Sequence, residues 1–111
     1  MDTPGYDPAS ITGEVAGGSN LVAFTTGRGS TYGCKPSPSI KIATNTEMYD
    51  KMQEDMDINA GRIVSDGDSI ETIGREIYDY LIAVASGRES LSESQGIGDN
   101  EFIPWQIGAT M

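Results

Sequence analysis

The 111-residue sequence predicts a small α/β domain with a short, mostly parallel sheet. An apolar run at 20–25 and an alternating segment at 39–44 have the length of strands, and a segment rich in glycine, serine and proline separates them. Between 70 and 84, apolar residues recur every three or four positions, which is the period of a helix buried along one face. Strands that alternate with helices favour parallel pairing, because the chain must cross back before the next strand starts.

The first half of the chain supplies the two clearest strands. Residues 9–16 follow a stretch of turn-forming residues and predict a turn or a short helix. The run at 20–25 is typical of a buried parallel strand. In the run at 39–44, Ile40 and Ile42 alternate with less apolar residues, which predicts the second strand.

Shorter elements are expected next. Asn45 or Thr46 can cap a helix that ends near Glu54. Residues 55–61 are polar and turn-like, and residues 62–64 can form a short third strand.

The clearest helix follows, where Asp68 and Glu71 have the spacing of a capping box and Gly87 is a suitable stop. The tail at 89–100 is polar, and the apolar residues at 102–107 must dock on another surface. These elements predict a three-layer domain of Rossmann-like or flavodoxin-like character.

The composition limits the class of protein. A chain of this length, residues 1–111, forms one domain with its own core. Its net charge of −10 argues against a nucleic-acid partner. With no histidine and one cysteine, the chain holds no Ser-His-Asp arrangement and no internal disulfide. It has no long apolar run and no leader, so we expect a cytoplasmic protein with no membrane partner.

The charges are distributed unevenly. No acidic residue occurs between Val15 and Thr46, a window that contains Arg28, Lys35 and Lys41. The rest of the chain holds all 17 acidic residues and only four basic ones. An acidic domain that keeps acids out of one segment is suited to bind an anion there.

The loop after the first strand is the part of this window best suited to an anion. Ligands of α/β domains bind at the carboxyl ends of the strands. Hydroxyl groups, a guanidinium and exposed backbone N–H groups meet in this loop, in the candidate substrate-binding residues Thr25, Thr26, Gly27, Arg28 and Gly29. An ordinary surface loop is the alternative.

Two further pairs of residues are candidates for chemistry. Lys35 can pair with a carboxylate or act as a base, and the Cys34 thiol beside it can serve as a nucleophile or a metal ligand. Asp57 and Asn59 alternate as in a calcium loop, but Ala60 stands where an EF-hand needs glycine. Both pairs have a plain alternative, as loop or turn residues with no chemistry.

The motifs together resemble a known family. The sequence is similar to the carboxyl-terminal region of altronate/galactarate dehydratases at Met1–Gly5, Phe24–Gly29, Pro38–Asn45 and Met56–Gly61. Cys34 after Gly33, the segment 95–98 and the Phe102-x-Pro104-Trp105 motif look closer to the altronate branch.

This resemblance implies that the chain is the last segment of a longer enzyme. That enzyme would eliminate water from a sugar acid to give a 2-keto-3-deoxy acid, with a divalent metal, iron(II) in the altronate branch. The expected partners are the sugar acid, the remaining domains of the parent enzyme and, as an open alternative, a second copy of the chain. A stand-alone anion-binding module and a sulfolactate sulfo-lyase domain are the alternatives, and we expect the isolated domain to be inactive.

The resemblance also implies roles for the candidate residues. Arg28 and the loop around it would hold the substrate carboxylate, with Asn45 and Asn59 as further substrate-binding residues. Lys35, or less favourably Lys41 in the middle of a strand, would neutralise charge or act as the base. Asp57 is the second catalytic candidate, and Cys34 and Asp57 are the weak candidates for metal ligands.

Overall fold

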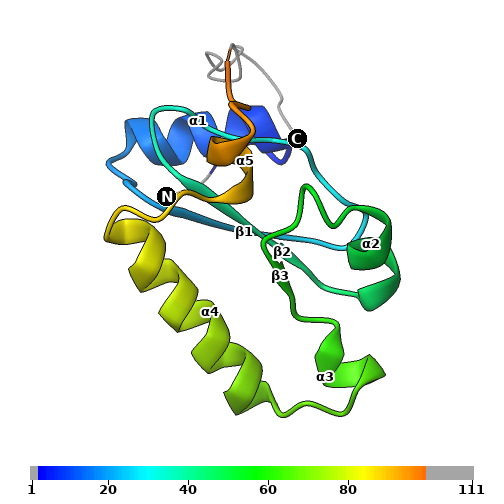
Figure 1. Ribbon diagram of the computed structural model, residues 1–111. Coiled ribbons are helices and arrows are strands. Elements are labelled where there is room, and N and C mark those ends of the chain that lie inside the picture. Colours follow the sequence, from blue (N-terminus) through cyan, green and yellow to red (C-terminus); the bar gives the residue numbers. More distant parts are fainter. Residues whose placement is uncertain (1–2, 100–111) are drawn as a thin grey trace.

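The structure is a computed structural model and describes residues 3–99. The chain forms a three-stranded sheet, and Figure 1 shows helices on both sides of it. In chain order the elements are α1 (Asp7–Ala16), β1 (Val22–Thr26), β2 (Ser39–Ala43), α2 (Thr46–Lys51), β3 (Ile58–Asn59), α3 (Arg62–Ser65), α4 (Ile70–Ala85) and α5 (Leu91–Ser94).

The sheet is parallel throughout, with strand order β1-β2-β3. Thr26 is paired with Ala43, and Ala43 is paired with Asn59. The last residues of all three strands therefore lie in one row, which we call the carboxyl edge. The short parallel sheet predicted from the sequence is confirmed.

Helices cover both faces of this sheet. On one face, apolar side chains of β2 and β3 pack against α4 in a cluster of Ile40, Ile42, Ile58 and Val84, with Ile77, Tyr80 and Leu81 at its border. On the other face, β1 packs against α1 in a cluster of Ile11, Val22, Tyr32 and Cys34. At the carboxyl edge, Ala43 packs against Met48 of α2. The arrangement has three layers, as predicted.

The third strand lies elsewhere than the sequence predicts. Residues 62–64 belong to helix α3, whereas β3 lies in the segment expected to be a turn. Only two residues of β3 have strand geometry, but the Asp57 N–H donates to the Lys41 carbonyl and the Ala60 N–H to the Ala43 carbonyl. This pairing with β2 defines the strand, and a two-residue strand leaves no periodic pattern in the sequence.

Asn45 caps α2 as predicted, whereas the cap of α4 differs from expectation. Helix α4 starts after Ser69, whose hydroxyl accepts a hydrogen bond from the Thr72 N–H at 3.1 Å. Asp68 was predicted as the cap, but its Oδ2 lies 3.8 Å from the Arg62 Nε in an ion pair. The tail predicted as polar contains α5, which begins with a capping box of Ser90 and Glu93. The apolar segment at 102–107 lies outside the described residues.

Candidate functional site

The segment without acidic residues, between Val15 and Thr46, which we call the acid-free window, contains the connection from β1 to β2. The two ends of this connection lie at opposite ends of the strands. Because the two strands are parallel, this connection leaves the carboxyl edge and returns to the amino ends of the strands. Arg28 is exposed at its start, beside the carboxyl edge. Cys34, near its end, is buried in the cluster with Val22, the first residue of β1. The structure therefore does not bring Cys34 and Lys35 together with Arg28.

Two residues fix the turn at the carboxyl edge. The Thr26 hydroxyl accepts a hydrogen bond from the Gly29 N–H at 3.0 Å. Gly29 has a φ of +104°, and a Cβ there would collide with the sulfur of Met52. Glycine is therefore required at this position for both its conformation and its lack of a side chain. Thr25, the preceding candidate, is exposed on the face of the sheet that α4 covers.

Asn45 joins this turn to helix α2. Its side-chain N–H donates to the Gly27 carbonyl at 2.9 Å, and its Oδ1 accepts from the Met48 N–H at 2.8 Å. The first bond holds the turn, and the second caps the helix. The structure thus brings Asn45 and the predicted loop together.

We expect Asn45→Ala to lower the free energy of unfolding of this chain by about 2 kcal/mol, because it removes a helix cap and a hydrogen bond. Urea unfolding monitored by circular dichroism measures the change. Asn45→Asp keeps the capping oxygen and loses only the donor to Gly27, so it should cost about half as much. Unchanged stability of Asn45→Ala would contradict this assignment.

An open groove of about 540 Å³ lies between the turn and α2. It is lined by Gly27, Arg28, Asn45, Glu47, Met48, Lys51 and Met52. Lys51 forms an ion pair with Glu47 at 2.8 Å, which raises the pKa of Lys51 and lowers that of Glu47. The groove therefore holds two cationic side chains, Arg28 and Lys51, and one anionic side chain.

Lys51 was not singled out from the sequence. The signal that could have found it is helical periodicity: Lys51 is four positions after Glu47 and three after Met48, so these residues share one face of α2. That face meets the turn after β1, because Asn45 holds the start of the helix against Gly27.

Asn59 lies at the same edge of the sheet, and its side chain is used locally. It donates to the Thr46 hydroxyl at 3.2 Å and accepts from the Gly61 N–H at 2.9 Å. These bonds tie the end of β3 to the start of α2. Asn59 is buried, so its observed contacts are structural and its predicted role in substrate binding stays a prediction.

Asp57 comes immediately before β3, at the opposite edge of the sheet from β1. Its Oδ2 accepts from the Lys41 N–H at 2.7 Å, and its Oδ1 accepts from the Tyr80 hydroxyl at 2.8 Å and from the Leu91 N–H at 2.9 Å. One carboxylate thus connects β2, α4 and α5. The structure does not bring Asp57 together with Arg28.

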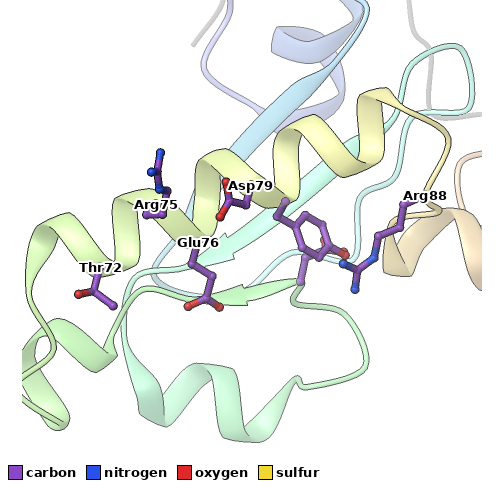
Figure 2. Close-up of a pocket in the computed structure, with 7 residues that line it drawn as sticks. Thr72, Arg75, Glu76, Asp79 and Arg88 are labelled. Carbon is purple, nitrogen blue, oxygen red and sulfur yellow. The ribbon is translucent and has the colours of Figure 1, made fainter.

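The Tyr80 ring packs at the border of the apolar cluster under α4, and its hydroxyl donates to Asp57. Burial, and secondarily its hydrogen bond to Asp57, raises the pKa of the Tyr80 hydroxyl. The Arg88 guanidinium lies over the Tyr80 ring, 4.6 Å from its centre. The adjoining pocket has a volume of about 600 Å³. Figure 2 shows Glu76, Asp79 and Arg88 among the residues that line it.

The two lysines predicted to act on a substrate have opposite environments. Lys35 is half-exposed and forms an ion pair with Asp99 at 2.6 Å. Lys41 is fully buried, and its pairing with Phe24 places it on the face of the sheet that α1 covers. Neither lysine lines the groove beside Arg28.

The described residues do not form a metal site. Between residues 3 and 99, no three His, Cys, Asp or Glu side chains gather where they could hold an ion. Cys34 is buried among apolar side chains, while the Asp57 oxygens accept hydrogen bonds from three donors. The metal implied by the family resemblance stays a prediction. In the same range, no helix is long and apolar enough to cross a bilayer.

Comparison with known proteins identifies the family. Residues 1–110 match the family described as D-galactarate/altronate dehydratase, C-terminal. Galactarate dehydratase (L-threo-forming) of Escherichia coli K12 is 40% identical over 93 residues, which are 84% of this chain and 18% of that protein. Altronate dehydratase of Bacillus subtilis 168 is 40% identical over 88 residues, 79% of this chain and 18% of that protein. This chain belongs to the D-galactarate/altronate dehydratase family and corresponds to its carboxyl-terminal domain.

The chain spans about a fifth of the length of these relatives. A (2R)-sulfolactate sulfo-lyase subunit beta of Chromohalobacter salexigens is more distant, with 25% identity over 93% of this chain. A galactarate and an altronate dehydratase match at the same identity, so the preference for the altronate branch stays a prediction.

Proposed function

We propose that this chain is the carboxyl-terminal domain of a sugar-acid dehydratase that eliminates water from altronate or galactarate to give a 2-keto-3-deoxy acid. The family match over nearly the whole chain carries this proposal. The full-length enzyme would act in the cytoplasm with a divalent metal, iron(II) in the altronate branch. Its metal would be held by residues outside the described range.

The groove beside Arg28 would bind the substrate carboxylate. Elimination of water begins with removal of a proton next to this carboxylate, which leaves a second negative charge on the same group of atoms. A cation held near the carboxylate stabilises that charge more than it stabilises the bound substrate. Arg28 is exposed, its loop is held by Thr26 and Asn45, and Lys51 lies in the same groove.

Turnover by the full-length enzyme tests this function. Purified protein would be incubated separately with altronate, galactarate and (2R)-sulfolactate, with iron(II) or magnesium restored after treatment with a chelator. We expect a 2-keto-3-deoxy acid from one of the sugar acids, detected by mass spectrometry. Turnover of (2R)-sulfolactate alone would overturn the proposal in favour of the sulfo-lyase alternative.

A further inference from the structure

The apolar face of helix α4 is wider than the part of it that packs against the sheet. Ile73 and Val84 are buried against the sheet, with exposures of 1% and 4%. By contrast, Ile70, Tyr78 and Ile82 are 71%, 55% and 51% exposed. These three side chains are spaced four or eight residues apart and so follow one side of the helix. We call them, together with Gly74 between them, the exposed row.

The exposed row faces the β1 side of the sheet. The opposite flank of α4 is fixed to the β3 side, because Glu76 forms an ion pair with Arg62 and Tyr80 donates to Asp57. On the face of the sheet that α4 covers, Ala23 and Thr25 of β1 are exposed. Helix α4 thus covers β2 and β3 and leaves β1 bare beside the exposed row. β1 is also the last strand on this side of the described sheet.

Gly74 lies in the middle of the row without a local reason for a glycine. A Cβ at this position would meet no atom within 4 Å, and the residue does not have a positive φ. Glycine inside a helix costs about 1 kcal/mol relative to alanine. A glycine between exposed apolar side chains suits the close approach of another backbone, as at packed helix interfaces.

We propose that the exposed row and the bare face of β1 dock against the part of the dehydratase that precedes this domain. The inference rests on the proposed function, in which the chain is one domain of a longer enzyme. Its relatives are about five times as long and match this chain with their carboxyl-terminal domain, so most of their length is available to cover this surface. The side chains of the row are uncharged, and the exposed residues Glu71 and Arg75 lie next to it on α4. The surface of the preceding part that meets the row is therefore apolar where it contacts these side chains and polar around them.

Thiol labelling of the full-length enzyme tests this docking. Tyr78→Cys places a thiol in the row, and Asp79→Cys places a matched thiol one position along on the exposed polar side of α4. Each variant is treated with N-ethylmaleimide, and the modified peptide is quantified by mass spectrometry. We expect the thiol at 78 to react at least tenfold more slowly than the thiol at 79 in the native enzyme, and at an equal rate in urea. Ile70→Cys provides a second position in the row with the same expectation.

Equal labelling of both positions in the native enzyme would overturn the proposal. Protection that disappears when the enzyme is diluted to monomers would also overturn it, by assigning the surface to a second copy of the chain. Labelling requires no substrate, so its outcome is separate from the turnover assay that tests the proposed function.

Discussion

Replacement of Arg28 by alanine in the full-length enzyme is expected to lower kcat/KM for the sugar acid by about 10- to 100-fold. A hydrogen bond to a charged group contributes about 1.5–3 kcal/mol, and a guanidinium can donate two such bonds to one carboxylate. The fold should be unaffected, because the Arg28 side chain is exposed and the loop is held by Thr26 and Asn45. Steady-state kinetics with the preferred sugar acid measure the effect.

Two variants make this result specific. Arg28→Lys keeps the positive charge but cannot donate two hydrogen bonds in the bidentate geometry of a guanidinium, so we expect an intermediate loss of kcat/KM. Arg75→Ala removes another exposed arginine, on α4 and outside the groove, and should leave kcat/KM unchanged. An Arg28→Ala enzyme with full kcat/KM would remove this residue from the substrate site.

The elements predictable from the sequence are those with a strong local pattern. Helix α4 and strand β2 follow from the spacing of their apolar residues, and β1 from an apolar run of strand length. β3 could not be found in this way, because its two residues are defined by pairing with β2 rather than by periodicity. The same limit applies to the acid-free window, which is continuous in sequence. Its two ends lie at opposite ends of the strands, because a parallel connection must cross the sheet.

The candidate site was likewise predictable only in part. The turn after β1 was indicated by its composition, and the structure places Asn45 against it. The environment of Asp57 had no local signal, because its three hydrogen-bond donors are 16, 23 and 34 residues away in sequence. The spacing of Asp57 and Asn59 suggested a ligand site, whereas both side chains have structural partners in the fold. A polar residue in a turn-like segment can thus connect distant elements, and only the tertiary structure reveals it.

Asp57→Ala is expected to have the largest effect on stability, a loss of about 3–5 kcal/mol in the free energy of unfolding. The substitution leaves the Lys41 N–H, the Tyr80 hydroxyl and the Leu91 N–H without their acceptor. A buried donor left without an acceptor costs about 1–3 kcal/mol, and these three bonds are partly buried, so each loss falls toward the lower end of that range. A typical domain has only 5–15 kcal/mol of stability, so this one carboxylate supports a large share of it. Urea unfolding of the chain monitored by circular dichroism measures the loss.

A comparison of the free energies of unfolding of three variants tests the structural role of Asp57. Asp57→Asn keeps one oxygen as an acceptor, so it should retain part of the stability that alanine loses. Asp79→Ala removes an exposed carboxylate from the same pocket and should change stability by less than about 0.5 kcal/mol. If Asp57→Ala unfolds at the same urea concentration as the wild type, the observed hydrogen bonds do not hold β2, α4 and α5 together. The catalytic role predicted from the sequence would then be the better explanation of this aspartate.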